Sequence, residues 1–71
     1  MSTTVNAPMA GKLVSVDVKV GDKVKKNDEV ATLEAMKMFI KVFSPADGTV
    51  ASIEAEADAT VDPTTVILTL E

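Results

Sequence analysis

Apolar and polar residues alternate along much of this 71-residue chain with a period near two. The clearest run is Val14 to Val20, in which every second residue is a valine and Ser15, Asp17 and Lys19 lie between them. Successive side chains of a strand point to opposite faces, so this run predicts a half-buried strand. Similar patterns predict further strands at Val30 to Leu33, Met38 to Phe43, Val50 to Ala57 and Val66 to Leu70.

Turn-forming residues separate these runs. Gly21-Asp22 follows the first predicted strand, a polar loop covers residues 25–28, and a Pro-Ala-Asp-Gly cluster covers residues 45–48. The alanine- and acid-rich segment 54–59 is too short to support the prediction of a helix. The pattern therefore indicates an all-β chain.

The chain also contains an internal repeat. A shift of 37 positions lays Val5 to Glu34 over Val42 to Glu71 without a gap, and Pro8 and Gly11 then coincide with Pro45 and Gly48. Further identities are Val5/Val42, Ser15/Ser52, Val24/Val61, Thr32/Thr69, Leu33/Leu70 and Glu34/Glu71. We therefore predict one domain over residues 1–71, built from half-repeats at about 5–34 and 42–71, each with about four short strands, packed face to face.

The segment Glu34-Ala35-Met36-Lys37-Met38 lies at the junction of the two half-repeats. One predicted strand ends at Leu33 and the next begins by Met38, which leaves room for a tight hairpin. Lys37 is then expected at or beside an exposed tip. The alternative is an ordinary strand with both methionines on one face and Lys37 in solvent.

Composition excludes several classes of function. The chain has no cysteine and no histidine, so it lacks disulfides, thiolate metal ligands and the usual general base. Its net charge is −4 and it has no Arg, Trp or Tyr, which argues against nucleic-acid binding. No apolar run reaches the roughly 20 residues that span a bilayer, so we expect no membrane insertion. The lysines at 23, 25 and 26 are interpreted as a solvated loop rather than a phosphate site.

Together with the segments 7–11 (Ala-Pro-Met-Ala-Gly) and 20–24 (Val-Gly-Asp-Lys-Val), the Glu-Ala-Met-Lys-Met segment resembles the biotinyl, or biotin carboxyl carrier, domain of biotin-dependent carboxylases. The resemblance covers about Val5 to Leu70. It implies a flattened antiparallel β-barrel, or sandwich, of two four-stranded sheets with quasi-twofold symmetry. The run from Val16 to Val24 leaves no room for the protruding thumb that some carriers of this family have, so the fold is expected to be thumbless.

The resemblance also implies a function. In this family a biotin protein ligase joins biotin to the lysine of Met-Lys-Met, here Lys37, through an amide bond. The biotin then carries a carboxyl group, as carboxybiotin, from a biotin carboxylase to a carboxyltransferase, which passes it to an acceptor such as an acyl-CoA or pyruvate. The carrier itself is not an enzyme. Glu34, Ala35, Met36, Met38 and Phe39 are then the expected contacts for the ligase and other partners.

Three alternatives stay open at this point. The same fold could carry lipoate, although related lipoyl domains usually present Asp-Lys-Ala where this chain has Met-Lys-Met. It could also be an unmodified interaction module. Phe39 could contact partners or merely cover the end of the barrel. The expected location is the cytoplasm, or an organelle matrix if the domain is part of a larger carboxylase.

Overall fold

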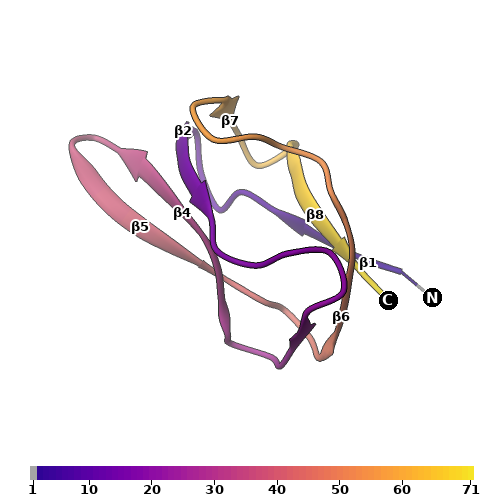
Figure 1. The fold of residues 1–71 in the computed structure, drawn as a ribbon. Helices are drawn as coiled ribbons and strands as arrows, with labels where there is room; N and C mark the ends of the chain where they lie inside the picture. The colour runs from indigo at the N-terminus through magenta and orange to yellow at the C-terminus, as the bar shows by residue number, and fades with distance from the viewer. Residues whose placement is uncertain (1) are drawn as a thin grey trace.

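The structure is a computed structural model that describes residues 2–71, and in that range the chain forms eight strands and no helix (Figure 1). Consequently no described helix has the length and hydrophobicity needed to cross a membrane. The strands are β1 (Thr3–Asn6), β2 (Gly11–Val16), β3 (Lys23–Val24), β4 (Glu29–Ala35), β5 (Met38–Phe43), β6 (Gly48–Ile53), β7 (Thr60–Val61) and β8 (Val66–Leu70).

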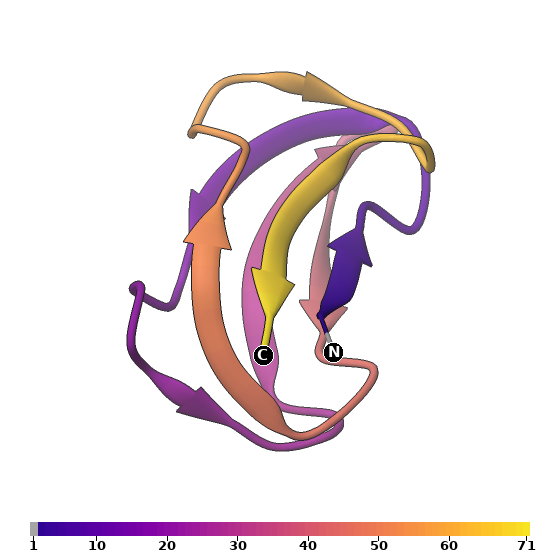
Figure 2. The same ribbon diagram turned by 90° about the vertical axis from the view of Figure 1, so that its right-hand side faces the viewer.

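The strands form two four-stranded sheets in which all paired neighbours run antiparallel. One sheet has the order β1-β8-β6-β3 and the other has the order β5-β4-β2-β7. The strands curve around a common interior, as Figure 2 shows. This arrangement confirms the predicted all-β sandwich, and the six-residue connection from β2 to β3 contains no inserted thumb.

A quasi-twofold relationship links the two sheets. Adding 37 to the residue numbers converts β2 into β6 and β3 into β7, and it places β1 and β4 over β5 and β8. The backbone hydrogen bonds between the two halves are related by the same shift of 37 positions. The amide of Gly21 donates to the carbonyl of Val50 at 2.8 Å, and the amide of Asp58 donates to the carbonyl of Leu13 at 2.7 Å. Each half-repeat therefore closes its turn against a strand of the other half.

The core lies between the sheets and consists of aliphatic side chains. Its largest fully buried members are Leu13, Leu33, Ile67, Leu68, Leu70, Val30, Val50 and Val61. Several are related by the same shift of 37, such as Leu13 with Val50 and Leu33 with Leu70. The core is thus built from β-branched and leucine residues that favour strands, as the near absence of aromatic residues predicts.

Two predicted strands have wrong limits. The strand predicted over Val14 to Val20 is β2, which begins at Gly11 and ends at Val16, because after Asp17, whose amide still donates to the carbonyl of Val30 at 2.9 Å, the chain crosses toward the other sheet. In this connection Val18 still packs against the core, whereas Val20 is 62% exposed, so the alternating pattern continues beyond the end of the strand. The strand predicted over Val50 to Ala57 is β6, which begins at Gly48 and ends at Ile53 for the same topological reason.

The other boundaries agree more closely with the prediction. β5 and β8 have the predicted limits, whereas β4 extends beyond the predicted 30–33 by one residue before and two after. Asn27 has a φ of 76°, a left-handed turn conformation that Asn tolerates better than most residues. Asp58, the counterpart of Gly21, has a φ of 73°.

The hairpin that joins β4 to β5 and the two chain ends lie on opposite sides of the molecule. In Figure 1 the hairpin projects at the upper left, whereas both termini lie close together at the lower right. The molecule measures 33 × 18 × 17 Å, so it is elongated. The quasi-twofold axis explains this placement, because the counterpart of the hairpin turn in the other half is the gap between the two chain ends.

Candidate functional site

The β4–β5 hairpin has a two-residue loop. Ala35 pairs with Met38 as the last pair of the ladder, so Met36 and Lys37 alone connect the strands. The register continues without a shift through Glu34 with Phe39, Leu33 with Ile40 and Thr32 with Lys41. The predicted tight hairpin is confirmed, and the alternative of an unbroken strand through Lys37 is wrong.

Both loop residues have left-handed backbone conformations. Met36 has a φ of 53° and Lys37 a φ of 64°, which is the geometry of a type I′ turn. Such turns favour Asn-Gly or Asp-Gly, and a non-glycine residue in this region costs on the order of 1–3 kcal/mol. Neither Met nor Lys relieves that cost. An observed outlier of this kind points to a functional reason for the residues that hold it.

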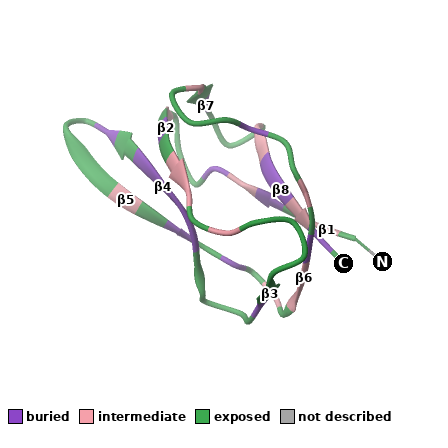
Figure 3. Ribbon diagram, viewed as in Figure 1, coloured by how far each residue is buried: buried purple, intermediate pink, exposed green. Residues whose placement is uncertain are grey.

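The side chains around the tip are exposed although several are apolar. Met36 is 93% exposed, Met38 65% and Phe39 71%, and Lys37 is exposed as well (Figure 3). The interpretation of Phe39 as a cover for the barrel end is therefore wrong. These three apolar side chains around Lys37 are termed the tip patch below. Single exposed apolar residues are ordinary, whereas here three of them lie within two positions of one exposed lysine.

Alternation along β5 explains why these side chains lie outside the core. Val42 is buried and Ile40 packs against the core, so they define the inner face of the strand. Met38 belongs to the same face but lies beyond the end of the core. Phe39, Lys41 and Phe43 belong to the outer face, and β5 is an edge strand of its sheet.

Lys37 differs from the other lysines of its sheet. The Lys12 ammonium lies 3.6 Å from a carboxylate oxygen of Asp58, and the Lys41 ammonium lies 3.8 Å from one of Glu29. Lys41 also donates to the Thr32 hydroxyl at 3.0 Å. Among the residues that the structure describes, Lys37 takes part in no ion pair and no side-chain hydrogen bond, and its side chain is exposed.

A polar network on the outer face stabilises the sheet that carries the hairpin. Asp17 accepts hydrogen bonds from the Ser15 hydroxyl at 2.8 Å and from the Thr32 hydroxyl at 3.1 Å. Thr32 in turn accepts the bond from Lys41. The network spans β2, β4 and β5, so it connects the strands directly below the tip.

Gly11 lies at the base of the hairpin and was not identified as a functional residue from the sequence, although the repeated Pro-x-x-Gly pattern drew attention to it. A Cβ atom at Gly11 would lie 2.5 Å from the backbone oxygen of Glu34 and 3.2 Å from the Cβ of Ala35. β2 therefore approaches the last residues of β4 more closely than any other residue type allows.

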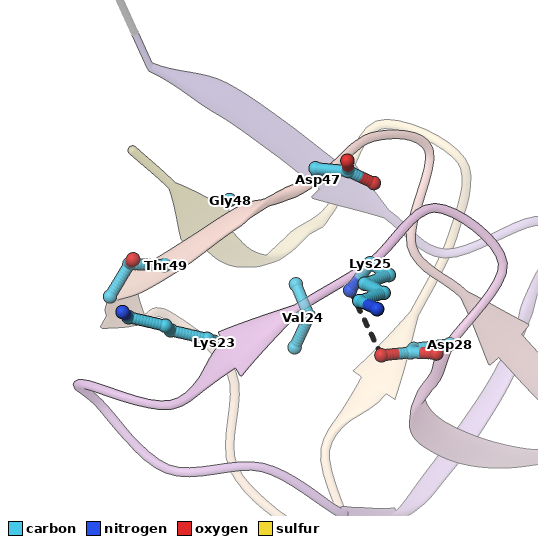
Figure 4. Close-up of a pocket in the computed structure, with 7 residues that line it drawn as sticks. All are labelled: Lys23, Val24, Lys25, Asp28, Asp47, Gly48 and Thr49. Carbon is cyan, nitrogen blue, oxygen red and sulfur yellow. Dashed lines mark hydrogen bonds between the residues drawn. The ribbon is translucent and has the colours of Figure 1, made fainter.

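The lysines at 23, 25 and 26 lie away from the tip, on β3 and the loop that follows it. Lys23 and Lys25 line an open pocket of about 420 Å³ together with Val24, Asp28, Asp47, Gly48 and Thr49 (Figure 4). The two carboxylates of this pocket accept hydrogen bonds from loop backbone amides. Asp28 accepts from the Lys25 amide at 2.9 Å, and Asp47 accepts from the Lys26 amide at 2.8 Å. The pocket therefore combines positively and negatively charged side chains.

Asp62 is the one described group with a clearly shifted pKa. The Thr64 hydroxyl donates to its carboxylate at 2.5 Å, the Thr64 amide donates at 2.8 Å, and the Thr65 hydroxyl donates at 3.3 Å. These bonds favour the charged form, so they lower the pKa of Asp62 below its usual 3.8, with Thr64 as the main cause. The group belongs to the turn between β7 and β8.

Comparison with known proteins identifies the family. Residues 3–70 match the biotin/lipoyl family described as "Biotin-requiring enzyme". The chain belongs to this family. The match includes both half-repeats and the hairpin between them, and it confirms the resemblance found in the sequence.

Two curated relatives of different length support the assignment. The biotin/lipoyl attachment protein of Bacillus subtilis is 40% identical over 67 residues, which cover 94% of this chain and 92% of that protein. The mitochondrial pyruvate carboxylase of Mus musculus is 39% identical over 67 residues, which cover 94% of this chain but only 6% of that enzyme. The chain therefore spans a small part of the multidomain relative and nearly all of the small one.

A solved structure agrees in fold. The lipoyl domain of the 2-oxoglutarate dehydrogenase complex from Azotobacter vinelandii superimposes with a TM-score of 0.76 at 24% identity, covering 96% of this chain and 94% of that domain. The chain therefore belongs to a family whose members include a small attachment protein and a segment of a carboxylase.

Proposed function

We propose that Lys37 is the site of covalent biotin attachment and that the domain is a biotin carboxyl carrier. The observation that carries the proposal is the turn itself: a lysine without an ion-pair partner occupies an exposed, left-handed position at the tip of a two-residue hairpin. The site fits biotin, because an amide-linked arm on Lys37 would leave the protein surface directly into solvent.

The chemistry of attachment needs a neutral, accessible amine. The Nζ of Lys37 attacks the carbonyl carbon of a biotinyl-adenylate held by a biotin protein ligase. The new C–N bond forms as the C–O bond to the phosphate breaks, AMP leaves, and the nitrogen loses a proton to solvent or to a base of the ligase. A rigid turn assists this step because it holds the nucleophile in one orientation.

The residues around Lys37 are suited to recognition. Met36, Met38 and Phe39 offer apolar surface that a ligase or another partner can cover, and flexible methionines adapt to more than one partner. Glu34 is exposed on β4 and adds a negative charge beside this surface, whereas Ala35 is buried and fixes the end of the strand. We assign these five residues to recognition and presentation of Lys37.

The position of the tip suits a carrier. Bound biotin supplies a ureido nitrogen that can accept a carboxyl group at one active site and release it at another. The residues of this chain hold the arm at the end of the molecule opposite both termini, so a segment joined to either end would begin on the side away from the arm. We propose a biotin carboxylase and a carboxyltransferase as the partners, in the cytoplasm or in an organelle matrix.

The proposal is tested by the intact mass of the protein after incubation with a biotin protein ligase, biotin and ATP. The expected result is a gain of one biotinyl group by the wild type and by Lys41→Arg, and no gain by Lys37→Arg. Lys41 is a matched control because it lies exposed on the same hairpin. A gain by Lys37→Arg, or none by the wild type, would reject Lys37 as the site.

The lipoyl alternative is tested in the same experiment with a lipoate ligase and lipoate. Met36 occupies the position where lipoyl domains of this fold usually have Asp, so we expect no lipoyl gain. A lipoyl gain without a biotinyl gain would assign the domain to lipoate. No gain with either ligase would favour an unmodified interaction module that uses the tip patch.

A further inference from the structure

Gly11 lies where the hairpin that carries Lys37 leaves the body of the domain. It is the first residue of β2, and its backbone pairs with Val61 of β7 on one side of the strand. On the other side, the next residue of β2, Lys12, pairs with Glu34 near the end of β4. The strand is therefore held by β7 on one edge and by β4 on the other, so it has little freedom to move aside.

The contact between Gly11 and β4 is too close for a side chain. An added Cβ would lie 2.5 Å from the backbone oxygen of Glu34, 3.1 Å from the Cδ1 of Leu33 and 3.2 Å from the Cβ of Ala35. A distance of 2.5 Å to a carbonyl oxygen is a hard overlap, and a backbone atom cannot rotate out of the way as the end of a long side chain can. The backbone of β2 at Gly11 or of β4 at Glu34 therefore has to shift to make room for a Cβ.

The segment that would have to shift is the one that sets the direction of the turn. Ala35 is followed at once by Met36 and Lys37, and among the described residues the pairing of β4 with β2 ends at Glu34. A displacement of the Glu34 carbonyl is therefore transmitted to the tip rather than absorbed by further pairing. Small displacements of a reacting group from a productive geometry can cost about 100-fold in rate.

We propose that Gly11 is a positioning residue for Lys37: by having no side chain it lets β2 pack against Glu34 and Ala35 and so fixes the orientation of the turn. This inference rests on the proposed biotin attachment at Lys37. It assigns a role in modification to a residue of β2, the strand beside the hairpin, rather than to a residue of the hairpin itself.

The quasi-twofold symmetry provides a matched control. Gly48 is the counterpart of Gly11 and begins β6. A Cβ at Gly48 would lie 3.1 Å from the backbone oxygen of Glu71 and 3.1 Å from the Cβ of Leu70. It is therefore also crowded, though less severely, but the neighbouring strand there leads to the chain end and not to the lysine.

The test compares Gly11→Ala with Gly48→Ala as substrates of a biotin protein ligase, below the unfolding temperature of each variant as measured by circular dichroism. We expect the kcat of biotinyl transfer to Gly11→Ala to fall about tenfold or more with a smaller change in KM, because the apolar contacts survive while the amine is misplaced. Gly48→Ala is expected to react like the wild type.

A second variant changes the same contact from the β4 side. It provides a test of the proposal in case Gly11→Ala does not fold. Ala35→Ser adds one atom beside Gly11, and a smaller fall in kcat in the same direction is expected. Wild-type kcat for folded Gly11→Ala would overturn the proposal, as would an equal fall for Gly48→Ala. If Gly11→Ala does not fold, wild-type kcat for Ala35→Ser overturns it. If neither folds, Gly11 serves the fold and the proposal is wrong.

The outcomes separate this inference from the proposed function. Wild-type protein that gains no biotin would reject the function at Lys37, whatever the glycine variants do. Wild-type protein that gains biotin, together with an unaffected Gly11→Ala, would keep the function and reject only the positioning role.

Discussion

Met36 and Lys37 are adjacent residues that both adopt left-handed backbone conformations, with φ values of 53° and 64°. Together they form the whole loop between β4 and β5. Neither residue type favours this region, and neither side chain is buried, so the conformation is sustained by the ladder on either side of the loop. The domain thus accepts a local cost in stability at the position where the lysine is presented.

The first prediction concerns that local cost. Met36→Asn is expected to raise the free energy of unfolding by about 1 kcal/mol, because Asn tolerates the left-handed region better than Met. The same change at Met38, in the extended strand β5, relieves no such cost and is expected to lower stability slightly. Urea denaturation of both variants measures the difference, and an equal effect at the two positions would contradict the account of the turn.

The second prediction separates recognition from packing at the tip. Met36→Asp is expected to leave the fold intact, because the side chain is 93% exposed, and to reduce biotin attachment or carboxyl transfer. Circular dichroism and ligase kinetics on the same sample measure the two effects. Unfolding of the variant would instead show that Met36 contributes to the core, which is opposite to its position in the structure.

The third prediction concerns the polar network below the hairpin. Thr32 is only 7% exposed, and its hydroxyl both donates to Asp17 and accepts from Lys41. Thr32→Val is expected to lower the free energy of unfolding by about 1–3 kcal/mol, because it removes the hydrogen bonds that Thr32 forms with the charged side chains of Asp17 and Lys41. Denaturant unfolding measures the loss.

The quasi-twofold symmetry supplies the control for this change. Thr69 is the counterpart of Thr32, and its hydroxyl shares one 2.7 Å hydrogen bond with that of Ser52. Thr69→Val is expected to cost less, because it removes one hydrogen bond to a neutral hydroxyl, whereas Thr32→Val removes two hydrogen bonds to charged groups. A larger loss at Thr69 than at Thr32 would argue against the role assigned to the network.

The fourth prediction concerns acid stability. The pKa of Asp62 is lowered in the folded state, chiefly by the Thr64 hydroxyl, so the associated stabilisation is present above the ordinary pKa of 3.8 and is lost as the pH falls through the folded value. An NMR titration is expected to show Asp62 titrating below 3.8 in the wild type and closer to 3.8 in Thr64→Ala. An unchanged titration in Thr64→Ala would show that the hydroxyl is not the cause.

Much of the fold could be predicted from the sequence because its two halves repeat. Pro8 and Gly11 recur as Pro45 and Gly48, and this shared register by itself indicates two related units. The strand limits were less predictable. Val18 and Val20 continue the alternating pattern beyond the end of β2, because a connection can still place Val18 against the core while Val20 stays exposed.

The candidate site was also largely predictable, since the Met-Lys-Met segment lies between the two halves and the strands on either side fix a hairpin. The left-handed conformation at Met36 and Lys37 was not, because neither residue type signals it. Nor could sequence reveal that Gly11 touches the backbone of Glu34. That contact joins strands distant in the chain, and only the packing of β2 against β4 shows it.

The most direct test of the central claim is to map which lysine carries biotin after treatment with a biotin protein ligase. Mass spectrometry of proteolytic peptides gives the answer for all seven lysines of the chain at once. The account predicts biotin on Lys37 and on no other lysine. Biotin on the loop lysines at 23, 25 or 26 with Lys37 unmodified would contradict it, because attachment would then not depend on the geometry of the turn.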